Sequence, residues 1–170
     1  MSAAVRPGVA TPIESLRATL RHSRAALRDA YLGGKTASWL LRAHARLSDR
    51  ILQDLWRAHA PSAGVALVAT GGYGRGELFP CSDVDVLVLL DGELPGAERE
   101  HLERLIGMFW DVGLEIGHSV RSVEACVELA KADITIETSL LEARPLAGSA
   151  SLYRRLSRAI EKSVDPAAFL

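Results

Sequence analysis

The segment ATGGYGRGELFPCSDVDVLVLLDG, from Ala69 to Gly92, contains the strongest structural signal in the sequence. It sets a glycine-rich turn directly after one apolar run and places Asp83 and Asp85 at the start of a second. Because side chains at i and i+2 of a strand share a face, the two carboxylates point together and repel each other. A bound cation would offset that repulsion. Oxygen ligands suit a hard cation such as Mg²⁺, so the sequence predicts a metal site at this strand.

The glycines before the aspartates favour an anion site. Gly71 and Gly72 directly follow the apolar run, and glycine lets backbone amides approach an anion without a Cβ in the way. If a helical turn starts near Tyr73, its free N–H groups point at the same anion. Arg75 can add a bidentate phosphate contact. The segment lacks the Gly-Lys-Ser/Thr end of a P-loop, and Glu77 stands where the dinucleotide fingerprint needs a small residue.

A purely structural interpretation of the aspartates stays open. In it, Asp83 caps a turn and Asp85 pairs with an arginine. For an isolated Asp-x-Asp that interpretation is favoured. Here it must also explain the apolar strand behind the pair and the phosphate-like turn before it.

Hydrophobic spacing predicts further strands and helices on both sides of this stretch. The expected strands are 65–70, 83–90 and 114–121, and the expected helices are 12–31, 36–59, 97–111, 123–131, 134–143 and 149–162. The turn LGGK at 32–35 makes the first two helices an antiparallel hairpin. Ser122 is the expected N-cap of the helix that follows it. Helices around a small core of strands place the fold in the α/β or α+β class.

Composition limits the function classes. The chain has 170 residues, of which 48% are hydrophobic and 24% charged, and its formal net charge is −1. Nucleic-acid domains usually carry a basic surplus, so a nucleic-acid partner is not expected, although a nucleotide needs only a local site. No apolar run approaches the about 18 residues of a membrane span. With two cysteines and no signal-peptide core, the expected location is the cytoplasm.

The spacing of Gly71-Gly72 and Asp83-Val84-Asp85 before hydrophobic residues resembles the signature of the DNA polymerase β-type nucleotidyltransferases. The longer segment GGYGRGELFPCSDVDVLVLL is similar to the N-terminal domain of the PII uridylyltransferase/uridylyl-removing enzymes. LWRAHAP before it and WDVGLEIGHSVRS after it extend the resemblance over most of the chain. The implied architecture is a small mixed sheet flanked by helices. Its regions would be an N-terminal helical part at 1–60, a nucleotidyltransferase core at 61–147 and a C-terminal helix of a longer enzyme at 148–170.

The resemblance also implies a reaction, the Mg²⁺-dependent transfer of UMP from UTP to a tyrosine of the PII signal protein with release of pyrophosphate. Gly71 and Gly72 would hold the triphosphate, and Asp83 and Asp85 would bind two Mg²⁺ ions. The family fold has a third carboxylate on a later strand. Glu115 is the candidate for this third carboxylate. The alternative, given equal weight, is that Glu115 is an ordinary surface residue of its strand.

Several assignments stay open. Ser82 either touches phosphate or serves a turn, and Tyr73 either stacks on the base or packs in the core. The nucleotide is UTP or ATP. A non-catalytic module of the same fold is the alternative class, whereas a tRNA-type enzyme fits poorly because Arg75 is followed by Gly76 rather than Asp. No histidine is followed by Asp, so the chain lacks the motif for removing UMP, and the isolated chain is expected to transfer poorly.

Overall fold

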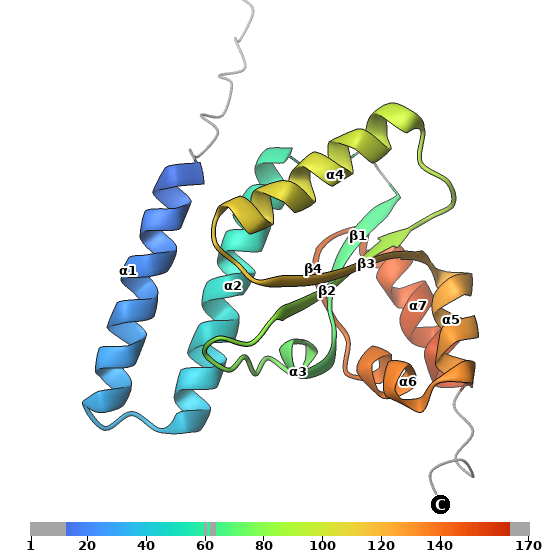
Figure 1. Cartoon of the computed structure of the whole chain (residues 1–170). Helices are drawn as coiled ribbons and strands as arrows, with labels where there is room; N and C mark the ends of the chain where they lie inside the picture. Colours follow the sequence, from blue (N-terminus) through green and yellow to red (C-terminus); the bar gives the residue numbers. More distant parts are fainter. Residues whose placement is uncertain (1–12, 60, 62–63, 164–170) are drawn as a thin grey trace, which may run out of the picture.

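The computed structural model describes residues 13–59, 61 and 64–163 (Figure 1). In chain order, the elements are α1 (Ile13–Leu32), α2 (Ala37–His59), β1 (Val65–Ala69), α3 (Gly71–Gly74), β2 (Val84–Leu90), α4 (Gly96–Asp111), β3 (Ile116–Ser122), α5 (Val123–Ala132), α6 (Ile134–Leu141), β4 (Arg144–Gly148) and α7 (Ala150–Ser163). Within these described residues, no helix combines the length and the apolar character needed to cross a membrane.

The strands form one mixed sheet in the order β3-β2-β1-β4. β1 runs antiparallel to both β2 and β4, whereas β2 and β3 are parallel. The α/β class and the mixed sheet predicted from the sequence are therefore confirmed. The parallel pairing sets Asp85 of β2 opposite Gly117 of β3, which brings the aspartate strand against the segment predicted to carry a third carboxylate.

Helices cover both faces of the sheet (Figure 1). α1, α2 and α4 lie on one face, and Val84, Val86 and Val88 of β2 pack into the apolar cluster that they enclose. α5, α6 and α7 lie on the other face, where Leu87 and Leu89 join a second cluster. Because side chains alternate along a strand, the aspartate two residues before Leu87 faces the second group of helices.

The helical hairpin of α1 and α2 shares its core with the sheet. Leu16 and Leu20 of α1 belong to the same apolar cluster as the valines of β2. The division into regions 1–60, 61–147 and 148–170 stays a prediction. Parts of its outer regions, residues 1–12 and 164–170, lie outside the described residues.

Two elements differ from the sequence expectation. β4 lies between two expected helices, where the sequence predicts no strand, and it pairs with β1 through a register shift beside Pro145. The helical turn proposed near Tyr73 is α3, and it begins two residues earlier, at Gly71. The strand expected at 83–90 begins at Val84, so Asp83 lies just before β2.

Candidate functional site

The glycine turn and the aspartates meet at one edge of the sheet. Gly71 directly follows the N-cap Thr70 and has a φ of +56°, in the left-handed region that favours glycine. The position where a Cβ would stand on Gly71 lies 4.0 Å from Oδ2 of Asp85. The backbone N–H of Thr70 also donates to the carbonyl of Asp85 at 3.1 Å. The convergence of the turn with the aspartate strand, expected from the sequence, is therefore present.

α3 offers free backbone donors at this point. It is a single turn, and the first N–H groups of any helix have no intrahelical acceptor. Thr70 makes no side-chain cap, so its hydroxyl does not occupy those donors. The backbone beside Asp85 is thus suited to an anion, as the sequence indicated.

The two carboxylates repel each other and lack counter-charges. Asp83 and Asp85 are both exposed, and among the described residues neither side chain makes a hydrogen bond or an ion pair. The partial desolvation of its carboxylate first, and the charge of Asp83 second, raise the pKa of Asp85 above its ordinary value. The structural alternative, with a capping Asp83 and an arginine-paired Asp85, therefore finds no support in the described part of the chain.

Gly117 makes room for the Asp85 carboxylate. A Cβ on Gly117 would stand 2.5 Å from Oδ1 of Asp85, closer than any real Cβ contact, and 4.0 Å from Cβ of Asp83. The carboxylate therefore lies over the β3 backbone, in space that a side chain would fill. This close approach is the physical reason for glycine at this strand position.

Glu115 directly precedes β3, and its backbone bonds to Val84, the residue between the two aspartates. Its backbone carbonyl accepts a 2.7 Å hydrogen bond from the N–H of Val84. Its side chain is exposed, and among the described residues no group of three or more His, Cys, Asp or Glu side chains is close enough to hold a metal. Glu115 as third carboxylate stays a prediction. The two unpaired carboxylates do fit a hard cation that takes its remaining ligands from phosphate and water oxygens.

The other predicted phosphate ligands have partners within the protein. Arg75 donates to a carboxylate oxygen of Glu142 at 2.5 Å and lies 3.9 Å from the carboxylate of Glu77. The hydroxyl of Ser82 donates to the carbonyl of Phe79 at 3.0 Å, which is the turn role that the sequence left open. Phosphate contacts by Arg75 and Ser82 stay predictions.

A part-buried hydrogen-bond network holds α3 in place. The hydroxyl of Tyr73 donates to Asp49 of α2 at 2.6 Å, and Arg144 of β4 donates to both carboxylate oxygens of Asp49 at 2.9 and 3.0 Å. Arg144 also donates to the carbonyl of Tyr73 at 3.1 Å. Tyr73 is 2% exposed, and burial followed by the Asp49 charge raises its pKa. Of the two roles open for Tyr73, core packing is the one observed.

Comparison with known proteins identifies the family. A family model described as a nucleotidyltransferase domain matches residues 49–136, a span that contains the glycine turn, both aspartates and Gly117. The chain belongs to the nucleotidyltransferase domain family. The fold class drawn from the sequence is confirmed by this match, and the resemblance is confirmed by the match together with the curated relatives described next.

Curated relatives share most of this nucleotidyltransferase domain. The chain is 47% identical over 94% of its length to a bifunctional uridylyltransferase/uridylyl-removing enzyme of Chromobacterium violaceum, and 48% identical over 94% to one of Thiobacillus denitrificans. A relative with the same name in Cupriavidus pinatubonensis is 56% identical over 73%. The chain spans 19%, 19% and 14% of these relatives. A solved structure, the toxin-antitoxin MntA-HpeT mutant, aligns with a TM-score of 0.40 at 13% identity over 67% of this chain and 84% of that one, which is too weak to support an argument.

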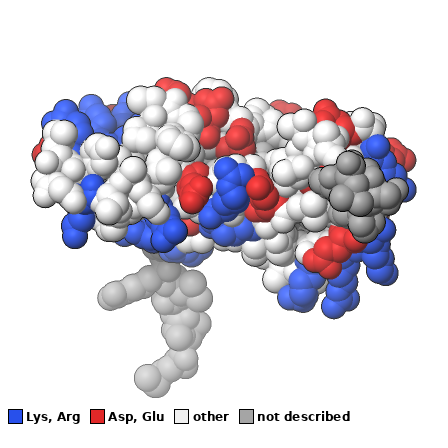
Figure 2. All heavy atoms as spheres, turned by 90° about the horizontal axis from the view of Figure 1, so that it is seen from below, with Lys and Arg blue, Asp and Glu red and all other residues white. Residues whose placement is uncertain are grey.

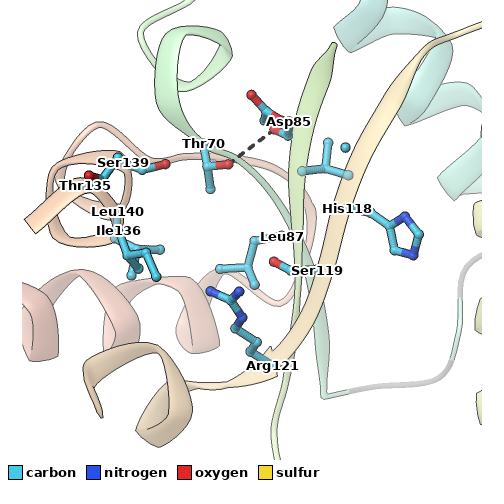
Figure 3. A pocket seen from close by; sticks show the side chains of 12 residues that line it. Thr70, Asp85, Leu87, His118, Ser119, Arg121, Thr135, Ile136, Ser139 and Leu140 are labelled. Atoms are coloured by element: carbon cyan, nitrogen blue, oxygen red, sulfur yellow. Dashed lines mark hydrogen bonds between the residues drawn. The ribbon is translucent and has the colours of Figure 1, made fainter. Parts of the chain in front are cut away.

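A pocket of about 400 Å³ opens beside Asp85 of the nucleotidyltransferase domain (Figure 3). Asp85 and Thr70 lie toward one end of it, and Ser139 and Thr135 of α6 form one wall. Arg121 extends from β3 into the pocket. These last three residues were not predicted as site residues. Strand alternation places Arg121 on the same face as Gly117, and this pattern could have predicted Arg121. No sequence pattern indicates that Ser139 and Thr135 of α6 lie against this strand.

The charges near α3 are mixed. Figure 2 shows the molecule from below, the side on which α3 and α6 lie in Figure 1. Acidic and basic side chains alternate across the middle of this face, and Lys and Arg gather toward its two ends. Outside its grey atoms, the face in view therefore lacks the continuous basic track that a nucleic-acid backbone requires.

Proposed function

We propose that this chain is the nucleotidyl-transferring part of a uridylyltransferase, which transfers UMP from UTP to a tyrosine hydroxyl of the PII signal protein. The tyrosine oxygen forms a bond to the α-phosphorus, the bond from that phosphorus to the pyrophosphate oxygen breaks, and the hydroxyl proton is released. The observation that carries the proposal is the meeting of the Gly71 turn with the unpaired, mutually repelling Asp83 and Asp85.

Each part of the site has a role in this proposal. The backbone N–H groups at Gly71 and Gly72 bind triphosphate oxygens and hold the α-phosphorus beside the aspartates. Asp83 and Asp85 hold Mg²⁺, with Glu115 as the proposed third carboxylate. When bound, the metal would neutralise charge on the triphosphate and assist the attacking hydroxyl.

Arg75 and Ser82 are proposed as outer phosphate contacts. Arg75 is half-exposed at the ion pair with Glu142, so its guanidinium can exchange that partner for a phosphate oxygen. Ser82 lies one residue before the aspartate pair, and its hydroxyl has acceptor capacity beyond its bond to Phe79.

The site supports catalysis over the alternative of a non-catalytic binding module. A module that only binds nucleotide or protein gains nothing from two adjacent carboxylates without counter-charges, because their repulsion weakens the fold. ATP in place of UTP stays the second candidate. The names of the relatives favour UTP. We also propose a cytoplasmic location, since Cys81 and Cys126 are free thiols, which suits a reducing compartment.

The test places this chain in its longer context. The matching segment of the full-length Chromobacterium violaceum relative is replaced by this chain, and the chimera is incubated with PII, Mg²⁺ and labelled UTP or ATP. We expect label on a PII tyrosine from UTP and no label when Asp83→Asn or Asp85→Asn is introduced. Label from ATP alone would overturn the choice of base, and full transfer by either variant would overturn the metal assignment.

Two controls sharpen this assay. Asp111→Asn changes another exposed carboxylate, at the end of α4 and outside the glycine turn, and should leave transfer unchanged. The isolated chain should transfer far less than the chimera, because PII must be docked with its tyrosine in line, and a misplacement of about 1 Å can cost about 100-fold. Equal turnover by the isolated chain would show that it contains the whole docking surface.

A further inference from the structure

Arg121 is a charged side chain without a partner inside the pocket. It extends from β3 into the pocket toward Leu87, whereas His118 of the same strand points to the other side (Figure 3). Arg121 is only half-buried, yet within the described residues its guanidinium makes no hydrogen bond and no ion pair. Its donors are therefore free for a ligand in the pocket.

The pocket has two chemically different ends. Asp85 lies at one end beside the glycine turn, and Arg121 lies at the other. Gly117, the register partner of Asp85, is four residues before Arg121 on β3, which corresponds to about 13 Å along the strand. A nucleotide has a comparable length between its phosphates and the far edge of its base. With the phosphates at the Asp85 end, the base would reach Arg121.

Between the two ends, the pocket suits a nucleoside. Ile136 of α6 provides apolar surface that can pack against a flat ring, and the largely buried Leu87 of β2 lines the pocket beside it. Ser139 and Thr135 of α6 provide hydroxyls within the same wall. Such a mixture of apolar surface and few polar groups is typical of a small-molecule site.

We propose that Arg121 selects the base by donating hydrogen bonds to the 4-carbonyl oxygen of uracil. The proposal rests on the proposed function, since that function sets the phosphates at Asp85. A guanidinium has donors and no acceptor. Cytosine carries an amino group where uracil carries this carbonyl, so CTP would set donor against donor and leave both groups unsatisfied. Guanine also carries a carbonyl, so a comparison with GTP would mix base size with hydrogen bonding. UTP and CTP have bases of equal size, and a comparison between them therefore tests the hydrogen bond from Arg121 alone.

The test measures binding of UTP and CTP, each with Mg²⁺, to the 170-residue chain by calorimetry. The unmodified chain should bind UTP more tightly than CTP. Arg121→Gln supplies an amide that can accept as well as donate, so the preference for UTP should fall on the order of 10- to 100-fold. Arg121→Lys keeps the charge but loses the forked pair of donors. Its preference for UTP over CTP should lie between those of the unmodified chain and Arg121→Gln. Arg154→Gln, on the exposed face of α7, is the matched control and should keep the preference.

The outcomes separate this inference from the function on which it rests. UTP preference that survives Arg121→Gln, or equal binding of UTP and CTP by the unmodified chain, overturns the role of Arg121 and leaves the transferase proposal standing. Failure of the unmodified chain to bind either triphosphate overturns both.

A second measurement needs no variant. 4-Thio-UTP carries a photoreactive sulfur at the base atom assigned to Arg121. Irradiation and peptide mapping should place the label on β3 near Arg121 or on the facing wall of α6. Label confined to α4 or to the segment 75–82 would overturn the assignment, whether or not the Arg121 variants fold.

Discussion

At the scale of single residues, ionised Asp85 lowers the stability of the folded chain, and a bound cation would remove this cost. Its carboxylate has neither a hydrogen bond nor an ion pair among the described residues, and burial and Asp83 both disfavour its charge. A group whose folded pKa is raised binds its proton more tightly in the folded state than in the unfolded state. Ionisation of Asp85 therefore lowers stability.

The first prediction concerns the removal of this ionisable group. In metal-free buffer, Asp85→Asn should be more stable than the unmodified chain at neutral pH. Below the ordinary pKa of 3.8 the difference should vanish, because Asp85 is then neutral in both states. Between 3.8 and the raised pKa, only the unmodified chain should lose this increment of stability as pH rises. Urea unfolding at a series of pH values measures the difference.

Asp111→Asn is the control, because Asp111 is also exposed and lies at the end of α4, outside the aspartate pair. It should match the unmodified chain in stability at neutral pH. Mg²⁺ should reverse the order for Asp85→Asn, since only the unmodified chain keeps both ligands. A variant that is less stable at neutral pH without metal would contradict the repulsion.

A second prediction compares two arginines. Arg144→Met removes a part-buried guanidinium that bonds both oxygens of Asp49 and the carbonyl of Tyr73, and it should cost about 1 to 3 kcal/mol of unfolding free energy. Arg155→Met breaks an exposed pair with Asp91 and should cost less than about 1 kcal/mol. Chemical denaturation of both variants measures the contrast. Equal losses would mean that the Asp49 network does not anchor α3.

At the scale of elements, α3 is wedged between the end of β1 and the segment that leads into β4. A Cβ on Gly74 would collide with the backbone carbonyl of Glu142 and stand 3.2 Å from the carbonyl of Ala69. Both obstacles are backbone, so neither can move aside without shifting an element. The position of the glycine turn over the aspartates depends on this close packing.

The third prediction is that Gly74→Ala costs about 1 to 3 kcal/mol of stability and weakens nucleotide binding, because α3 must shift away from α6. Gly107→Ala in α4 is the matched control, since a Cβ there would meet nothing within 4 Å. Alanine is the better helix former by about 1 kcal/mol, so the control should gain stability. Thermal melts and UTP titrations of the two variants measure both effects. Unchanged UTP binding in Gly74→Ala would separate α3 from the site.

Most elements could be predicted because their signals are local. Asp83 and Asp85 precede a continuous apolar run, and Gly71 and Gly72 follow one. Ser122 is the predicted N-cap of α5, and its hydroxyl accepts from the N–H of Ala125 at 3.2 Å. β4 could not be predicted. Its sequence RPLAG contains a proline and a glycine, and its strand conformation comes from pairing with β1, which is distant in the sequence.

The candidate site was predictable to the same degree. The contact of Gly71 with Asp85 follows from two strands joined by a short segment, which the sequence displays. The pocket depends on how α6 packs against β3, and no spacing in the sequence reports that packing. Arg121 was therefore missed, although it lies on the same strand face as Gly117.

At the scale of the whole molecule, ligand binding and folding are linked. Anything that binds only the folded state stabilises it by an amount that depends on concentration relative to Kd. The site draws on β1, α3, β2, β3 and α6, so a bound nucleotide would join three strands of the sheet to α3 and α6. Unfolding of the chain would have to release it.

The fourth prediction is a melting shift. At 100 times its Kd, UTP with Mg²⁺ should add about 2.7 kcal/mol and raise Tm by roughly 5 to 11 °C in a chain of this size. UTP added with a metal chelator should give a much smaller shift in Tm. UTP with Mg²⁺ should also give a much smaller shift in the Asp85→Asn variant. Differential scanning calorimetry measures each case. An equal shift with and without Mg²⁺ would mean that the triphosphate binds elsewhere than at the aspartates.

The contact between Gly117 and Asp85 limits which substitutions can be accepted at position 117 during evolution. While the aspartate is needed, every substitution at position 117 pushes its carboxylate aside, so selection for activity holds both positions together. In a relative that has lost the reaction, the Asp85 carboxylate no longer has to keep its position, so a side chain at 117 becomes acceptable. We therefore expect residues other than glycine at 117 to accompany loss of transfer among relatives of this chain.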